Sequence, residues 1–573
     1  MAVSTKRLLT AVGWKNTRGG DNMRSRKKYD MWNWIAVALL LLFLLFFIYP
    51  CVRLMWEAFY TQKDGFTIKA FVKFFSKSYY TKTIGNSFKV SGAVMLICLV
   101  LGIPFSYFFT FYELKGRRFL FIMALLCTMS APFIGAYSWI MLLGRNGVIT
   151  QFVKRAFGIK MGNIYGFNGI LLVQALKLFP LVMIYMNGAF QDIDNSLMEA
   201  SANLGCSGVK RFFKIVMGLT MPTILAAALI VFMRAFADFG TPAIIGEGYK
   251  TFPVLIYDSF LGDAGSDYNF ASAVSVLAIV LTGVIFLLQK LATSYFKFTI
   301  NSLHPIQKKK PTGISGLLMH LYCYILIAIA ILPQIYIIVD SFRDYKGQVP
   351  QSTYSMSNYR NAVRKLLPRA TKNSIVISFL ALAVIIIVAV LIAYLVVRRS
   401  SALSHTVDTI SMLPYIMPGA VIGISLIISF NNKPFVLTGT MAIMVISMAI
   451  RRMPYTSRSA TATMMQIPMS TEEAAISLGA GKLKTFIIIT IPQMASGIIS
   501  GAILSFVSIV TEVSSTIFLF NNRTITLTIG TYQAISLGSY GTASAFATVT
   551  TLVTIVCLVV YLICTRGSER MSV

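Results

Sequence analysis

Long apolar runs alternate along the chain with short polar segments that are mostly basic. A transmembrane helix needs about 20 apolar residues to cross about 30 Å of hydrocarbon. Runs of this length form two sets of six, so the pattern predicts an all-α integral membrane protein with about twelve transmembrane helices. The first set covers residues 32–54, 86–111, 118–143, 167–189, 222–245 and 270–292. The second set covers residues 315–340, 373–397, 405–429, 436–453, 493–519 and 543–564.

The polar segments predict a division of the chain into four parts. These are a basic cytosolic N-terminus (1–31), a first half (32–296), a cytosolic linker (297–314) and a second half (315–573). The first apolar run is too long for a signal-peptide core and lacks a small-x-small cleavage site, so we interpret it as the first transmembrane helix. An even number of spans in each half places both termini on the same side of the membrane as the basic N-terminus, which is the cytosol.

Composition supports a membrane location and argues against a catalytic or metal-binding function. Hydrophobic residues make up 56% of the chain and charged residues 12%, whereas soluble domains carry about 25% charged residues. The 51 Lys and Arg residues outnumber the 20 Asp and Glu residues, but they flank apolar runs instead of forming a polar nucleic-acid-binding domain. The seven cysteines and three histidines show no metal-ligand spacing. We therefore predict no catalytic residue, no metal site and no nucleic-acid partner.

The two halves carry the same motifs at a constant separation. Glu199 and Glu473 lie 274 positions apart, and the same offset relates Pro180 to Pro454 and Asp238 to Glu512. Three matches at one offset indicate an internal duplication. Because each half has an even number of spans, the two copies have the same orientation in the membrane, as in a parallel repeat.

Each half contains a short polar motif between its fourth and fifth spans. The motif is S-x-x-E followed by small residues and a glycine, which resembles a capping box at the start of a helix. Ser196 and Ser470 would cap two short cytosolic helices, near 196–215 and 470–485, and Gly205 and Gly479 would break the helix and let the chain turn. Well-capped loop helices would need no partner, but two copies at equivalent places favour a docking function.

These motifs resemble the membrane subunits of binding-protein-dependent ATP-binding-cassette importers, which carry E-A-A-x-x-x-G followed by I-x-L-P. The second copy fits closely, and the first departs at Ser201 and at Pro222, which comes four residues late. The residues that carry the resemblance are Glu199, Ala200, Gly205, Glu473, Ala474, Ala475, Gly479 and Ile489–Pro492. The fusion of two halves, with Asp238–Pro242 and Tyr249–Tyr257, is similar to the ferric-iron branch of this family.

The resemblance implies a permease with the type I importer fold in a bacterial plasma membrane. Two copies of a cytosolic ATPase would dock on the two short helices, and an extracytoplasmic binding protein would deliver the solute. ATP and magnesium would bind the ATPase, since this chain has no G-x-x-x-x-G-K-[ST] phosphate loop. The solute would be iron(III), or alternatively a phosphonate, a phosphorylated organic solute or thiamine. An ion-coupled secondary transporter is a further alternative.

Charged residues inside spans are costly and usually face a cavity or a partner. Asp238 and Glu512 occupy equivalent places near the ends of two spans, and Arg234 lies one turn before Asp238. An Arg234–Asp238 ion pair is one interpretation; the other places these residues on the transport path, together with Tyr137 and Tyr415. The two acids would suit a cation such as Fe(III), whereas Arg234 and Lys177 would suit an anion.

Prolines and arginines predict two further features of the spans. The third and ninth spans should be kinked at Pro132, and at Pro414 and Pro418. Arg451-Arg452 should mark the cytosolic end of the tenth span, as basic residues commonly do.

Overall fold

The computed structural model describes residues 31–61, 64–160, 162–262, 267–295, 304 and 306–564. Residues 1–30 of the basic N-terminus and residues 297–303 and 305 of the predicted linker lie outside the described residues. The first half contains α1 (Met31–Phe43), η2 (Leu44–Ile48), α2 (Tyr49–Phe59), β1 (Tyr60–Thr61), β2 (Gly65–Phe66), α3 (Lys69–Ser76), α4 (Ser78–Phe111), α5 (Arg117–Met129), α6 (Pro132–Leu143), α7 (Val148–Phe157), α8 (Phe167–Gln191), α9 (Asn195–Asn203), α10 (Gly208–Arg211), η3 (Phe212–Val216), α11 (Met217–Phe236), α12 (Gly240–Ile245), α13 (Phe252–Leu261) and α14 (Tyr268–Tyr295), where η denotes a π-helical turn.

The second half follows the same order. It contains α15 (Gly313–Asp340), β3 (Arg343–Lys346), β4 (Val349–Tyr354), α16 (Ser357–Lys365), α17 (Leu367–Arg398), α18 (Ala402–Ile416), α19 (Gly419–Phe430), α20 (Met441–Gln466), α21 (Met469–Ser477), α22 (Lys482–Thr485), η4 (Phe486–Thr490), α23 (Ile491–Gln493), α24 (Ala495–Val510), α25 (Thr516–Leu519), α26 (Leu527–Ser536) and α27 (Tyr540–Cys564). The elements from α8 to η3 recur from α20 to η4 with the 274-residue offset, so the predicted duplication is confirmed in the backbone.

The helices confirm a multi-pass membrane protein. Eight are long and apolar enough to cross a membrane, or up to eleven if each bent helix pair is one span. The remaining predicted span, residues 436–453, corresponds to α20, which runs on to Gln466 and carries Arg451, Arg452 and Arg458 in its interior. Hydropathy placed the end of this span too early, because it treated buried arginines as a membrane boundary.

The predicted kinks at Pro132 and Pro418 are complete breaks, whereas Pro414 lies inside α18. The chain bends by 101° between α5 and the segment that starts with α6 at Pro132, and by 110° between α18 and α19, which follows Pro418. A third bend of 69° separates Lys482–Gln493 from α24, whereas the equivalent segment of the first half, Gly208–Phe236, is one continuous helix with Pro222 inside it. The halves therefore differ after α9 and α21, where the late position of Pro222 already separates the two copies, and it is the second half that is bent.

The two halves exchange their first helices. In the first half α4 packs on α8 and α11, and in the second half α17 packs on α20 and α24. The helices α1 and α2 pack on α17, α18 and α19 of the second half, where Trp32 contacts Tyr394 and Phe486. In turn, α15 packs on α5 and α6 of the first half. Each half therefore completes part of the other's apolar core.

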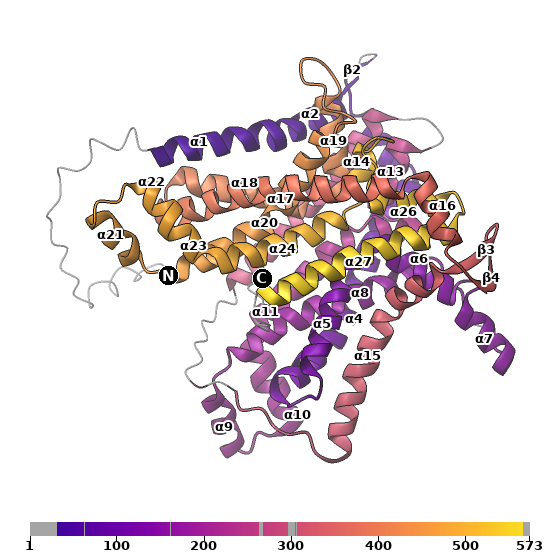
Figure 1. Ribbon diagram of the computed structural model, residues 1–573, viewed down its shortest axis with the longest axis horizontal. Helices are drawn as coiled ribbons and strands as arrows, with labels where there is room; N and C mark the ends of the chain where they lie inside the picture. The colour runs from indigo at the N-terminus through magenta and orange to yellow at the C-terminus, as the bar shows by residue number, and fades with distance from the viewer. Residues whose placement is uncertain are drawn as a thin grey trace, which may run out of the picture.

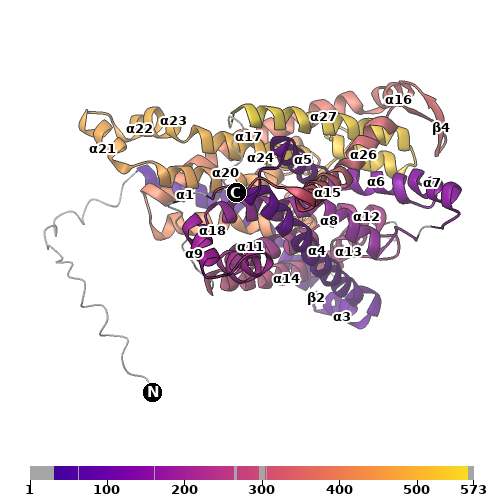
Figure 2. The same cartoon turned by 90° about the horizontal axis from the view of Figure 1, so that it is seen from below.

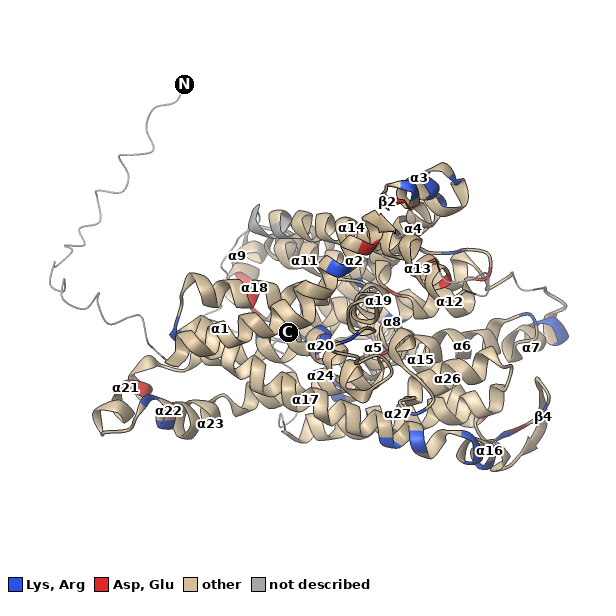
Figure 3. Ribbon diagram, turned by 90° about the horizontal axis from the view of Figure 1, so that it is seen from above, with Lys and Arg blue, Asp and Glu red and all other residues tan. Residues whose placement is uncertain are grey.

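The short elements separate to opposite ends of the helical bundle. The helices α9 and α21 lie at one end, on the left in Figure 1, where the described chain also begins and ends; the hairpins β1–β2 and β3–β4 lie toward the other end with α7 and α16 (Figures 1 and 2). Lys and Arg residues are concentrated in α3, α7 and α16 at this second end (Figure 3).

Candidate functional site

The two predicted docking helices are α9 and α21, and they end in the same way. In each, the residue after the C-cap is a glycine with positive φ, +74° at Gly205 and +89° at Gly479. The amide of Cys206 donates to the carbonyl of Ser201 (2.9 Å), and that of Ala480 to the carbonyl of Ala475 (3.0 Å). These are Schellman closures, for which glycine is favoured because it adopts the left-handed conformation without steric cost. The predicted glycine stops are confirmed.

The predicted capping boxes are wrong in both copies. Asp194, two residues before Ser196, caps α9 by accepting from the Ser196 amide (2.8 Å). Glu199 instead accepts from the Asn195 side chain (2.6 Å). Helix α21 begins after Pro468 with no side-chain cap. Pro468 has the extended backbone conformation of an N-cap but offers no side-chain acceptor to the first amides of α21.

The two docking helices present the same residues to solvent. Glu199, Ala200, Glu473 and Ala474 are exposed, and Ala475 is half-buried. A fully exposed leucine occupies the C-cap of each helix, with 87% of Leu204 and 89% of Leu478 accessible. The same exposed leucine therefore ends each copy of the duplicated motif.

Sequence analysis missed what holds α21 in place. Glu472, not Glu473, points inward; it is buried and accepts from Arg398 Nε (2.9 Å) and from Tyr394 (3.4 Å), both on α17. Arg398 also donates to the carbonyl of Ile467 (2.7 Å) just before the helix. The doubled glutamate was the only signal in the sequence, and it does not show which of the two is buried.

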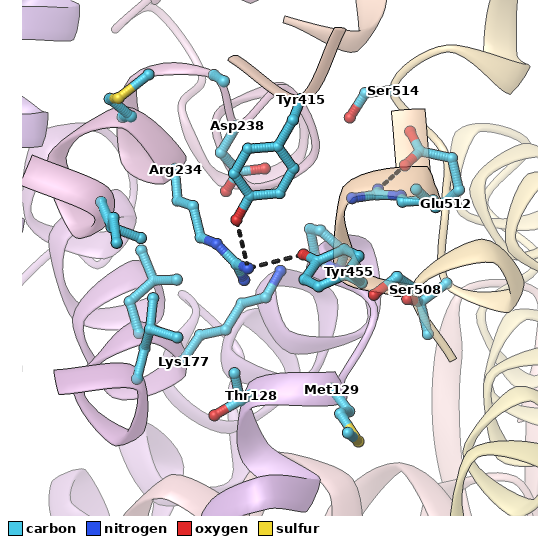
Figure 4. Close-up of a pocket in the computed structure, with 18 of the residues that line it drawn as sticks. Thr128, Met129, Lys177, Arg234, Asp238, Tyr415, Tyr455, Ser508, Glu512 and Ser514 are labelled. Atoms are coloured by element: carbon cyan, nitrogen blue, oxygen red, sulfur yellow. Dashed lines mark hydrogen bonds and ion pairs between the residues drawn. The ribbon is translucent and has the colours of Figure 1, made fainter. Parts of the chain in front are cut away.

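Between the halves lies a cavity of about 370 Å³. Its charged and phenolic lining comes from Lys177, Tyr185, Arg234 and Asp238 of the first half and from Tyr415, Arg451, Arg452, Tyr455 and Glu512 of the second. Four of the five predicted path residues, Arg234, Asp238, Tyr415 and Glu512, therefore line one space (Figure 4). The structure places Tyr137 elsewhere: it is buried and donates to the carbonyl of Tyr540 (3.1 Å).

The predicted ion pair between Arg234 and Asp238 does not form. Arg234 Nη2 donates to the hydroxyls of Tyr415 (3.1 Å) and Tyr455 (2.7 Å). Asp238 accepts from Gln174 (3.0 Å) and from the amide of Gly240 (3.0 Å), which starts α12. The tyrosines come from the opposite half, so Arg234 links the two halves across the cavity.

The acid of the second half is fully neutralised. Glu512 is buried and ion-paired with Arg451 (2.5 Å) and with Arg452. The prediction that Arg451-Arg452 marks the cytosolic end of a span is therefore wrong, because both residues lie near the middle of α20 and face the cavity. The cavity thus contains four basic and two acidic side chains, a net charge of +2.

Comparison with known proteins places this arrangement in a family. The chain is 28% identical over 522 residues to a ferric transport system permease protein of Actinobacillus pleuropneumoniae, covering 90% of this chain and 75% of the relative. It is 28% identical over 492 residues to a putative ferric transport system permease protein of Haemophilus influenzae, covering 84% and 77%. A crystal structure of a bacterial ABC transporter for alginate import covers 46% of this chain and 97% of that chain, with a TM-score of 0.38 and 18% identity.

The family match extends over both halves, at residues 29–298 and 385–572. Both segments include one of the two predicted docking helices and residues that line the central cavity. The chain belongs to the family of binding-protein-dependent transport system inner membrane components.

Proposed function

We propose that this chain is the permease of an ATP-driven iron(III) importer, with α9 and α21 as the docking helices for two copies of a cytosolic ATPase. The observation that carries the docking proposal is the pair of equivalent helices with exposed Glu, Ala and Leu side chains at one end of the bundle. That end is then cytosolic, as are both termini. ATP and magnesium are bound by the ATPase, because this chain lacks a phosphate loop.

An external binding protein delivers the solute at the opposite end, near β1–β2, β3–β4 and α16. Iron(III) as the solute is supported by the two ferric permease relatives, each of which matches both halves of this chain. A phosphonate, a phosphorylated organic solute or thiamine remains the alternative; the net positive cavity favours the anionic members of this group.

The docking proposal is tested by purifying the tagged chain from membranes that carry the complete transport system. Wild-type chain should retain an ATPase, and the combination Glu199→Arg with Glu473→Arg should lose it through charge reversal on both docking surfaces. Glu113→Arg is the matched control, because Glu113 is also exposed at this end but lies outside both helices. Retention of the ATPase by the double variant, or turnover of ATP by the chain alone, contradicts the proposal.

The solute is tested by uptake of radioactive iron into cells that contain the complete system. Iron should accumulate in wild-type cells and not in cells that lack this chain. An excess of 2-aminoethylphosphonate should leave iron uptake unchanged. Competition by the phosphonate, or no accumulation of iron, would favour the alternative solutes.

A further inference from the structure

The central cavity is basic, and its basic side chains are unequally matched by carboxylates. Glu512 pairs with Arg451 and Arg452 in the second half. In the first half Asp238 accepts only neutral donors, from Gln174 and the α12 backbone. Among the described residues, neither Lys177 nor Arg234 forms a salt bridge, and Asp238 attracts Lys177 through its charge without a hydrogen bond.

These two cations converge on one point. Arg234 is held from the far side by the hydroxyls of Tyr415 and Tyr455, and Lys177 extends from α8 toward the same place (Figure 4). Lys177 makes no hydrogen bond or ion pair with any residue that the structure describes. Like charges that face each other in an interior repel strongly unless an anion lies between them. This arrangement is what an anion-binding site requires.

Polar atoms of the cavity lining that lack a hydrogen-bond partner also favour an anion-binding site. Three buried side-chain atoms of lining residues have no hydrogen-bond partner: Nε of Arg451, Nε of Arg452 and Oε1 of Gln174. Two of the three are cationic donors. Buried donors are normally satisfied, so the lining has capacity for additional oxygen acceptors.

We propose that the central cavity is an oxyanion site, which binds a phosphate, phosphonate or carboxylate group between Lys177 and Arg234. The inference rests on the proposed function, because it places this cavity on the transport path. It also deepens that function: iron(III) crosses as an anionic complex with such a ligand and not as a bare cation. A cavity with a net charge of +2 repels a bare trivalent cation. It attracts an anionic complex in which oxyanions surround the cation.

Tyr185, Tyr415 and Tyr455 offer the opposite possibility, because phenolic oxygens are hard ligands for a bare metal ion. Tyr415 and Tyr455 both already accept from the Arg234 guanidinium, which would lie next to the metal. A trivalent cation as a separate probe distinguishes the two possibilities.

Binding to the purified full-length chain in nanodiscs of neutral lipid tests the proposal. The probes are inorganic phosphate, Fe(III)–citrate and La³⁺, followed by equilibrium dialysis. We expect saturable binding of at least one of the two anions and none of La³⁺. Binding of phosphate alone would show that the oxyanion occupies the site by itself; binding confined to Fe(III)–citrate would show that it occupies the site as a ligand of the metal.

Lys177→Gln is the informative variant, because Lys177 makes no internal bond that its loss would break. It should weaken anion binding by about tenfold or more, the usual effect of losing one charge-assisted hydrogen bond. Lys177→Arg should retain binding, and Lys160→Gln, which removes one positive charge from an exposed loop, should bind like wild type. Binding of La³⁺ in place of both anions, no saturable anion binding, or an unchanged Lys177→Gln variant overturns the proposal.

Uptake of radioactive iron separates this inference from the proposed function. If wild-type cells with the complete system accumulate no iron, the iron proposal fails, whatever the cavity binds. If they accumulate iron while the purified chain binds neither anion, the oxyanion inference alone fails.

Discussion

The two docking helices share one backbone but are held by different chemistry. Met198 in α9 and Glu472 in α21 occupy the same position of the repeat. Met198 is buried in the apolar cluster that also contains Phe111 at the end of α4. Glu472 is buried against Arg398 at the end of α17. The duplication thus preserved the fold of the docking helix while one half replaced apolar packing by an ion pair.

The two halves also differ in how the charged residues that they contribute to the cavity are paired. Lys177 and Arg451 are equivalent by the 274-residue offset, as are Asp238 and Glu512. In the second half the base and the acid pair with each other. In the first half they form no hydrogen bond or salt bridge, and Asp238 acts on Lys177 through its charge alone. The second half is therefore fixed by internal ion pairs at both places, whereas the corresponding residues of the first half form none among the described residues.

Loss of Glu512 should be the most damaging change. Glu512→Gln leaves Arg451 and Arg452 buried without a carboxylate, and breaking a buried ion pair costs about 3–5 kcal/mol. Its counterpart Asp238→Asn removes an acceptor of neutral donors and should cost only about 0.5–1.5 kcal/mol. Denaturant unfolding of the two variants in nanodiscs measures the difference. Equal losses would show that the two halves are fixed equally well.

Loss of Arg398 should release α21 without unfolding the protein. Arg398→Met leaves Glu472 buried without its ion-pair partner, which should cost about 3 kcal/mol, at the lower end of the range for breaking a buried ion pair. Faster amide exchange in α21, with α9 unchanged, is the expected result. The combination Arg398→Met with Glu472→Met should restore slow exchange, because it reproduces the apolar packing of the first half. Glu473→Gln, at an exposed neighbouring position, serves as the control.

The first docking helix should respond to a different change. Asp194 caps α9, and its carboxylate also accepts from the amide of His304 (3.1 Å) in the connection between the halves. Asp194→Ala should cost about 1 kcal/mol, as the loss of an N-cap usually does. Exchange should rise in α9 only. A rise in α21 would mean that the two docking helices are coupled through the connection.

Some features of the two halves could be predicted from the sequence and others could not, and the reasons are physical. The glycine stops and the helix breaks at Pro132 and Pro418 were predictable because they depend on local backbone preferences. The inward direction of Glu472 was not. Neighbouring residues on a helix differ in direction by about 100°, and the choice between Glu472 and Glu473 depends on Arg398, 74 positions earlier in the chain.

The arginines of α20 show the limit of hydropathy. A window that counts each arginine as unfavourable ends the span at residue 453, although the helix continues to Gln466. What keeps Arg451 and Arg452 inside is Glu512, about 60 residues later. The 274-residue offset aligned Glu512 with Asp238, but an offset relates equivalent positions and does not identify the partner of either one.

The hairpins at the opposite end provide the smallest expected effect. Hydrogen bonds from Ser355 and Ser357 hold the pKa of Asp344 in β3 below its ordinary value. A carboxylate with a lowered folded-state pKa stabilises the fold above its unfolded pKa of about 3.9, and this contribution is lost as the pH falls through the folded value. The hairpin β3–β4 should therefore open below about pH 4. Amide exchange, corrected for the intrinsic rate at each pH, measures this opening. Asp344→Asn should already exchange faster at pH 7 and lose the acid dependence. An acid dependence that persists in this variant would assign the effect to another group.

The hairpin β1–β2 should respond to salt instead of acid. The exposed ion pair between Asp64 in its turn and Lys69 in α3 (2.9 Å) is screened by added salt, so amide exchange in β1–β2 should rise with salt more than exchange in β3–β4.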